Sequence, residues 1–180
     1  MSEARITVGN VEIVALTDLE VDFPYPLSQL FPSVSAADWQ PFQQRYPGVF
    51  SGPDTWHNHF GCYLLRSQGQ TILVDTGVGS NTTNPGMVGA LGGQDGGLMT
   101  ELSGLGVRPE DVDTVFFTHL HPDHVGWNLQ EAGGSQLMFS NARYIAHQRD
   151  WDTFGSPEVQ EQLPMSFWQE TLAPLESPVR

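Results

Sequence analysis

One short segment holds most of the side chains that are suited to chemistry. It reads Thr-His-Leu-His-Pro-Asp-His-Val-Gly and occupies residues 118–126, directly after an apolar run. His119, His121, Asp123 and His124 place four possible metal ligands within six residues. Imidazole and carboxylate ligands together suit zinc, with iron or manganese as alternatives. The segment therefore predicts a metal site.

The spacing of these ligands indicates two neighbouring ions. In an extended chain, residues i and i+2 point to the same side, so His119 and His121 can face one ion while Leu120 points into the core. Pro122 stiffens the turn that follows, and the Asp-His pair at 123–124 then faces an adjacent position. A chance polar cluster in a turn is the alternative. Burying several histidines beside an aspartate without an ion would leave costly unsatisfied groups.

Strands and helices that alternate along the chain must position this segment. The predicted strands are a hairpin over 6–16 around Gly9-Asn10, a hairpin of 60–66 with 71–74, a buried strand at 112–118, and strands at 137–139 and 143–146. The predicted helices are 35–46 with Ser35 as N-cap, 98–105 closed by Gly106, and a helical stretch over 147–172 interrupted at Pro157 and Pro164. This order is typical of an α/β layered domain.

Residues 20–56 are rich in proline and aromatic residues and contain a single predicted helix. They are interpreted either as one wall of a pocket or as a surface excursion whose aromatic side chains pack on the core. Trp56, His57 and His59 follow directly and are candidate substrate contacts, because residues 57 and 59 can share one face of a strand. A surface placement of these histidines is the alternative. His147 is interpreted as structural.

Composition excludes several classes of protein. The chain has 180 residues, 39% of them hydrophobic and 16% charged, and a formal net charge of −14. The net charge argues against nucleic-acid binding, because the chain repels phosphate backbones. All seven basic residues are arginine, and the absence of lysine excludes lysine-dependent Schiff-base and P-loop chemistry. Cys62 is the only cysteine, so no intrachain disulfide forms. With no visible signal peptide or membrane-spanning run, a cytoplasmic protein without membrane association is expected.

The residues 118–126 match the His-x-His-x-Asp-His signature of the metallo-β-lactamase fold hydrolases. Upstream, Ile-Leu-Val-Asp-Thr-Gly-Val-Gly at 72–79 resembles the strand and turn that precede the signature in that family. The resemblance covers Ile6 to about Trp151. With its long aromatic N-terminal loop, the chain is similar to the branch containing quorum-quenching lactonases and parathion-type hydrolases.

The resemblance implies an αββα sandwich of two similar αβ halves. Residues 1–180 are then a single partial domain, the first half plus a helix, with the insertion at about 20–56. His119 and His121 would bind the first metal, and Asp123 and His124 the second. Asp75 would lie behind the ligands and orient their loop, unless it is simply a turn residue that ends a strand. The family's second half supplies a further His to each metal and a bridging Asp.

Because no histidine follows His147, the chain is expected to be a fragment. In a complete enzyme, a hydroxide between two zinc ions would attack a small-molecule ester, lactone or phosphotriester. Asp123 would be catalytic, orienting the hydroxide and passing its proton to the leaving group. One alternative is a non-catalytic half-domain that needs a complementing chain, or that self-associates through its uncovered sheet face. Alternative chemistries are glyoxalase-II-like thioester hydrolysis and iron-based oxygen or sulfur chemistry, whereas the acidity disfavours RNA cleavage.

Overall fold

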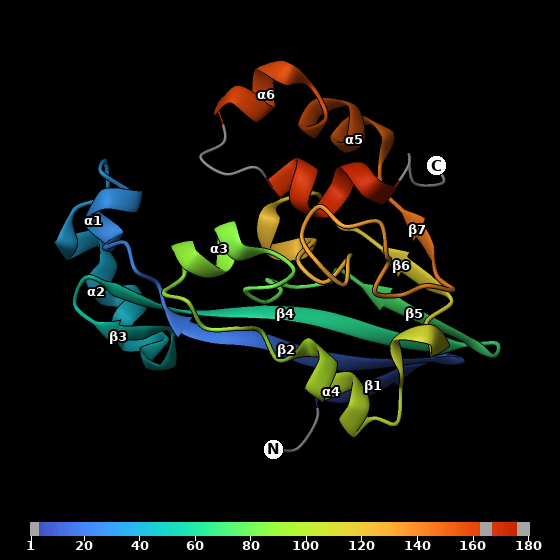
Figure 1. Ribbon diagram of the computed structural model, residues 1–180. Coiled ribbons are helices and arrows are strands. Elements are labelled where there is room, and N and C mark those ends of the chain that lie inside the picture. The colour runs from blue at the N-terminus through green and yellow to red at the C-terminus, as the bar shows by residue number, and fades with distance from the viewer. Residues whose placement is uncertain (1–3, 163–166, 176–180) are drawn as a thin grey trace.

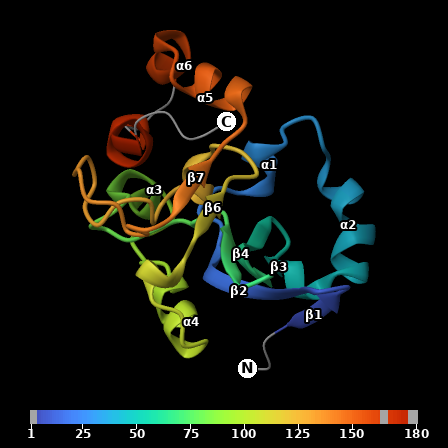
Figure 2. The same cartoon turned by 90° about the vertical axis from the view of Figure 1, so that its right-hand side faces the viewer.

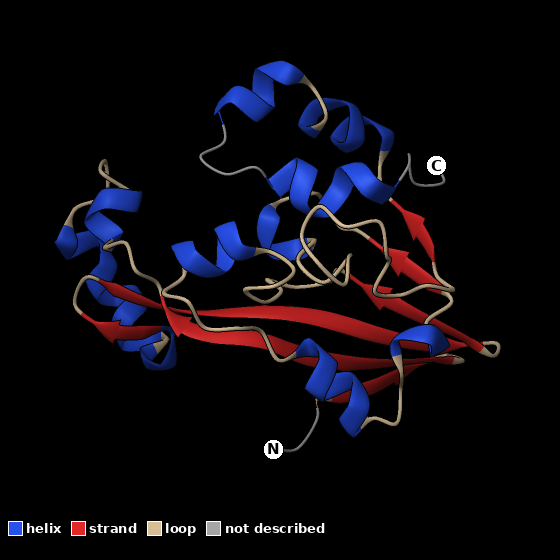
Figure 3. Ribbon diagram, viewed as in Figure 1, coloured by secondary structure: helices blue, strands red, loops and turns tan. Residues whose placement is uncertain are grey.

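The computed structural model describes residues 4–162 and 167–175, and within them the strands form one mixed sheet (Figures 1 and 3). The strands, in sheet order, are β1 (Arg5–Val8), β2 (Val11–Asp22), β4 (Thr55–Ser67), β5 (Gln70–Val74), β6 (Thr114–Phe116) and β7 (Arg143–Ile145), while β3 (Phe50–Gly52) pairs with the start of β4. From β1 to β5 the pairing is antiparallel, and β5, β6 and β7 run parallel. The predicted α/β class is confirmed.

The helices are short and lie in the connections. They are α1 (Leu27–Leu30), α2 (Ala36–Arg45), α3 (Pro85–Ala90), α4 (Leu98–Gly104), α5 (Gln148–Phe154) and α6 (Pro157–Gln162), with 3-10 turns at 47–49, 109–111, 122–124 and 173–175 and a π turn at Trp168–Leu172. At α2 the Asp38 carboxylate accepts the Ser35 backbone N–H at 3.1 Å, which confirms the predicted N-terminus. No helix in the described part of the chain is long and apolar enough to cross a membrane.

Turn residues with positive φ angles connect the strands of the two predicted hairpins. Between β4 and β5, Gln68 and Gly69 take positive φ angles of 51° and 77°, as a two-residue hairpin turn requires. Between β1 and β2, Gly9 takes φ 63°. Both hairpins are therefore confirmed, and β4 begins earlier than the predicted strand, at Thr55.

One face of the sheet is buried in the main core. Directly paired residues on successive strands form a row whose members are 0% to 6% exposed, namely Val14, Leu64, Leu73, Val115 and Tyr144. Leu98 and Leu102 of α4 belong to the same core cluster. Figure 2 shows α3 and α4 to this side of the sheet and α1 and α2 to the other.

The adjacent row of paired residues lies on the opposite face, and it is also apolar. It runs Ala15, Tyr63, Val74, Phe116 and Ile145. Tyr63 is 51% exposed and Phe116 is 44% exposed. The prediction of a fully buried strand at 112–118 is therefore wrong at Phe116, because alternation places it on the outer face while Val115 and Phe117 face the core.

Three further predictions differ from the structure. Residues 137–139 form no strand, and only Leu137 bridges to Leu129, because this part of the chain is held by loop hydrogen bonds. Helix α3 was not predicted, since the glycines in Pro-Gly-Met-Val-Gly-Ala lower helix propensity. The predicted helical stretch over 147–172 is divided into α5, α6 and the π turn. Pro157 opens α6, whereas Pro164 lies outside the described residues.

Candidate metal centre

Residues 118–126, named here the ligand turn, leave the carboxyl end of β6 at the buried Phe117. Leu120 is 0% exposed and anchors the turn in the core, as the sequence predicts. Pro122–His124 form a 3-10 turn with the proline in its first position, where its fixed φ suits a helical start. The chain therefore reverses over a few residues, which brings the side chains before and after Pro122 together.

Three imidazole rings gather in the ligand turn. The ring centroids of His119 and His121 are 4.5 Å apart, and those of His119 and His124 are 4.0 Å apart. Burial lowers the pKa of His119, and the nearby His124 and His121 lower it further. The neutral form of His119 is thereby favoured, and this is the form that binds a metal.

Asp75 joins the two ends of the ligand turn. It follows β5, is 5% exposed and adopts φ 62°, a backbone conformation that Asp tolerates better than most residues. Its carboxylate accepts the Thr118 backbone N–H at 2.8 Å and the Thr118 hydroxyl at 2.7 Å. It also lies 2.8 Å from Nδ1 of His124. A proton on Nδ1 leaves Nε2 as the ligand atom of His124.

Asp123 lies on the other side of the His124 ring, with Oδ2 3.3 Å from Nε2. Burial opposes ionisation of Asp123, yet the hydrogen bond with His124 and the charges of His124 and His121 hold its pKa below the usual value. Burial also opposes protonation of His124, but hydrogen bonds to Asp123 and Asp75 raise its pKa to about 9. His124 must therefore release a proton to bind a metal.

The donor types of the ligand turn fit a divalent metal, since three imidazoles and a carboxylate lie together beside a buried carboxylate. Among residues 4–162 and 167–175, however, no three His, Cys, Asp or Glu side chains are oriented so that they could hold one ion together as they stand. In His124 both ring nitrogens face carboxylate oxygens. Metal binding would exchange the contact between Asp123 and His124 for contacts of both with the ion.

Backbone hydrogen bonds hold the ligand turn against the loop that follows β5. The Thr76 N–H donates to the His124 carbonyl at 2.8 Å, and the Gly126 N–H donates to the Gly77 carbonyl at 2.8 Å. A side chain at Gly126 would collide with the backbone of Val78, so only glycine allows this approach. The backbones of the ligand turn and of this loop therefore lie in direct contact at Gly126.

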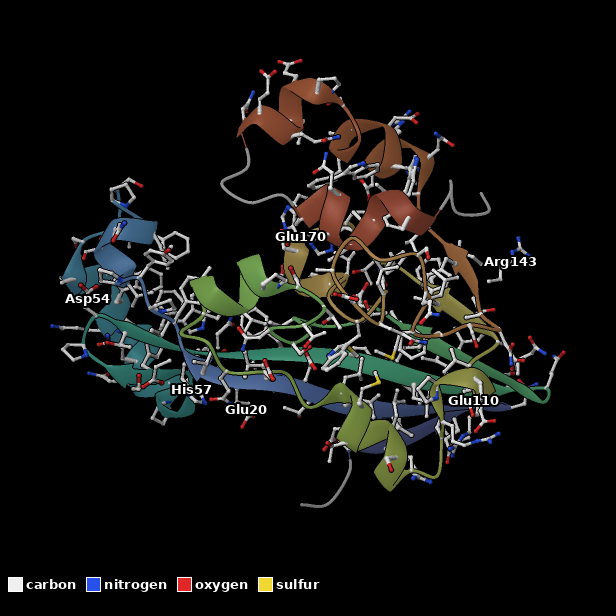
Figure 4. The ribbon with its side chains drawn as sticks, viewed as in Figure 1. Glu20, Asp54, His57, Glu110, Arg143 and Glu170 are labelled. Carbon is white, nitrogen blue, oxygen red and sulfur yellow. The ribbon has the colours of Figure 1, made fainter. Side chains whose placement is uncertain are left out.

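The three candidate substrate contacts, Trp56, His57 and His59, lie at different places in the structure. His59, with β4 residues 58–63, lines a cavity of about 320 Å³ that Asp123 and His124 also line. His57 lies 2.8 Å from Asp22 at the far end of β4 (Figure 4), and Trp56 lines a different cavity. The ring of His59 lies 3.1 Å from the Thr17 hydroxyl.

The 20–56 segment encloses a cavity of its own, of about 230 Å³. Its lining is entirely apolar or aromatic: Leu27, Phe31, Trp39, Phe42, Tyr46, Val49, Phe50 and Trp56. The indole N–H of Trp39 is buried and has no hydrogen-bond partner among the described residues. The aromatic residues therefore form a pocket wall, as one of the two interpretations held, but Asp123 and His124 do not line this pocket.

Sequence reasoning missed two polar residues that support the ligand turn. Asn84 is 0% exposed, and its amide donates to the Pro122 carbonyl at 2.9 Å and to the Val78 carbonyl at 2.8 Å. Asp18 is 4% exposed and bonds to the indole of Trp127, directly after the ligand turn. The only signal for Asp18 is an acidic residue within the apolar alternation of β2.

Known proteins resemble this chain in sequence and in fold. Residues 62–132 match the family model of the Metallo-beta-lactamase superfamily. N-acyl homoserine lactonase AiiB of Agrobacterium fabrum is 31% identical over 100 residues, covering 51% of this chain and 33% of AiiB. The N-acyl homoserine lactonase of Bacillus cereus is 29% identical over 97 residues, covering 48% of this chain and 38% of that protein.

Solved structures share the fold. AidC, a dizinc quorum-quenching lactonase, superposes with a TM-score of 0.76 at 20% identity, over 99% of this chain and 60% of AidC. Hydrolase AbOPH has a TM-score of 0.69 at 23% identity, over 90% of this chain and 50% of AbOPH. The chain thus spans less than two thirds of each of these proteins. Motif, relatives and architecture together show that this chain has the metallo-β-lactamase fold and resembles the hydrolases of that superfamily.

Proposed function

We propose that this chain carries the metal-binding part of a hydrolase that acts on an ester, lactone or phosphotriester of a small molecule, with two zinc-type ions in the complete site. The observation that carries the proposal is the packing of His119, His121, Asp123 and His124 into one turn at a cavity. The lactonase relatives support the substrate class. The single free thiol, Cys62, is buried, which suits a reducing compartment such as the cytoplasm.

The residues have distinct roles in this proposal. His119 and His121 would hold one ion, and Asp123 and His124 the other. When bound, the ions would lower the pKa of a water molecule and polarise the substrate oxygen. Asp123, whose pKa is already lowered, would orient that water and carry its proton to the leaving group. Asp75 would hold the Nδ1 side of His124 and so leave Nε2 as the atom that binds the ion.

The aromatic cavity of the 20–56 segment, which is separate from the cavity of Asp123 and His124, would receive an apolar group of the substrate rather than its reacting bond. Its only buried donor without a partner among the described residues is the Trp39 indole N–H, which suits a carbonyl or phosphoryl oxygen carried by an apolar group. Highly anionic substrates should be poor, because the chain carries −14 and has no lysine to bind phosphates. Thioesters remain the alternative substrate class.

Metal counting and an ester panel test the proposal. The chain, and any longer form that continues it, would be titrated with Zn²⁺ and assayed with an N-acyl lactone, an aryl ester, an aryl phosphotriester and a thioester. We expect His121→Ala to lose at least half of the bound zinc. His147→Ala, which removes a histidine at the start of α5, is the matched control and should retain it. Equal zinc binding by His121→Ala and the parent would refute the assignment.

Asp123→Asn separates a catalytic role from metal binding. In a form of the protein that turns over substrate, this variant should keep its fold but lose most of its turnover, since an amide cannot accept the proton. Near-parental turnover, measured with the same ester panel, would show that Asp123 has no such role.

A second candidate function is a half-domain that requires a complementing chain. The apolar outer row of the sheet, with Tyr63 and Phe116 about half exposed, favours it. An apolar face of this kind is covered in stable proteins, so the chain should self-associate or bind a partner that supplies the missing cover. Light scattering on the purified chain distinguishes this from a stable monomer.

A further inference from the structure

Asp18 is a buried acid at an irregular position of β2. The register between β2 and β4 shifts between Thr17 and Leu19, so Asp18 is the extra residue of a β-bulge. The alternation of β2 places Asp18 on the core face with Val14 and Leu16, and its side chain there is 4% exposed. A buried carboxylate is costly unless several donors compensate it, so the donors around Asp18 identify what it is there to hold.

Four N–H groups from three separate segments surround the Asp18 carboxylate. The backbone N–H groups of Val78 and Gly79 donate to Oδ2 at 2.6 and 3.4 Å. The Leu98 N–H, at the start of α4, and the indole N–H of Trp127 each donate to Oδ1 at 2.9 Å. Burial raises the pKa of Asp18 above its usual value, and these four hydrogen bonds offset part of that rise. Because every partner is a donor, the ionised carboxylate is the form that fits.

Two of these segments are the ones that hold the ligand turn. The loop at 76–79 donates a backbone hydrogen bond to His124 and accepts one from Gly126. Gly126 also packs directly on Val78. Trp127 follows the ligand turn immediately, and its own N–H donates to the Thr76 carbonyl at 3.1 Å. Asp18 therefore fixes both sides of the contact between the 76–79 loop and the ligand turn.

Asp18 and Asp75 act on the ligand turn from different places. Asp75 bonds to Thr118 and to the His124 ring, within the turn itself. Asp18 bonds to the supporting loop and to the residue that leaves the turn. Both acids lie around Cys62 of β4. Burial raises the pKa of the Cys62 thiol, and the charges of the two acids raise it further.

We propose that Asp18 is a positioning residue of the candidate metal centre, whose carboxylate fixes the 76–79 loop and the Trp127 indole so that the ligand turn is set in place before a metal binds. The proposal rests on the proposed function for its link to metal. Its structural part, the ordering of the ligand turn, stands independently of it.

Two variants of the full chain test the proposal. Asp18→Asn replaces a carboxylate, which only accepts hydrogen bonds, by an amide. The NH2 group of the amide would face at least one of the N–H groups that now donate to Asp18, and that hydrogen bond would be lost. Trp127→Phe removes only the indole donor and leaves the carboxylate with its backbone partners, so it stays informative if Asp18→Asn does not fold. Trp151→Phe is the matched control, since Trp151 lies on α5 and packs in a tilted arrangement against Trp168, with ring centroids 4.8 Å apart.

Amide hydrogen exchange of the metal-free chain is the first measurement. In both test variants the Thr76 and Gly126 amides, which pair the loop with the ligand turn, should exchange at least tenfold faster than in the parent. The β4–β5 amides should not change. If Asp18 had only a general structural role, the exchange rates of both groups of amides would rise together. That result would overturn the proposal, and so would unchanged exchange at Thr76 and Gly126.

Titration with Co²⁺ is the second measurement. Both test variants should bind cobalt at least fivefold more weakly than the parent, whereas Trp151→Phe should bind like the parent. Unchanged cobalt affinity in Trp127→Phe would refute the link between Asp18 and the metal centre. Absence of cobalt binding by the parent would instead contradict the proposed function, and the hydrogen-exchange result would then decide the positioning role alone.

Discussion

Both faces of the sheet are lined by apolar residues, but the described part of the chain buries only one of them. Leu73 and Val74 are neighbours on β5, yet Leu73 is fully buried in the main core, while Val74 lies in the partly exposed outer row. Tyr63 of the outer row also lines the cavity that Asp123 and His124 share. The apolar outer face and the candidate metal centre therefore adjoin, and whatever covers the first will also border the second.

The largest expected effect is a difference in the free energy of unfolding between variants of two adjacent residues of β5. Leu73→Ala should lower the free energy of unfolding by about 3 kcal/mol, because it leaves a cavity in a packed core. Val74→Ala should cost less than about 1 kcal/mol, since its side chain is already partly in solvent. Urea denaturation of dilute protein measures both. Equal losses would mean that the outer face is covered in solution.

A medium effect concerns association through the outer face. Phe116→Gln should reduce self-association in light scattering, because it removes one of the two exposed rings of the row, and should alter the unfolding free energy little. Phe42→Gln is the control, an equal change at an aromatic residue that is 53% exposed on α2. If both variants reduce association equally, the sheet face has no special part in it.

The smallest effect extends the comparison to a surface ion pair, Arg108–Asp111, which lies before β6 and whose side chains are 68% and 38% exposed (Figure 4 labels the intervening Glu110). Hydrogen bonds from the Arg108 side chain and backbone lower the pKa of Asp111 to about 2. A depressed carboxyl pKa stabilises the fold above the usual Asp range, and this contribution is lost as pH falls toward 2. Carboxyl ¹³C titration should show this midpoint, and Arg108→Gln should move it back toward the ordinary value.

Sequence patterns were sufficient where a local rule decides the structure. The Gln68-Gly69 turn, the Ser35 cap and the ligand spacing around Leu120 all depend on residues that are close in the chain. The exposed Phe116 was not predictable from its apolar run, because the missing cover is a property of the whole fold.

The role of Asp18 was hidden for a related reason. Alternation along β2 places Asp18 on the core face, but its hydrogen-bond partners lie far along the chain and no local pattern names them. Likewise, the separation of Trp56 from the cavity of Asp123 depends on how the 20–56 segment closes on itself, which no local pattern encodes.

The hydrogen bonds of Asp18 also constrain the order of folding. They join residues 60, 80 and 109 positions apart in the chain. Contacts of such separation close large loops, and they form after local hairpins such as β1–β2 and β4–β5. During synthesis the carboxylate must wait for Trp127 to emerge before its set of donors is complete. The ligand turn is therefore among the last parts of the chain to become ordered, and a folding intermediate with formed hairpins would not yet hold a metal.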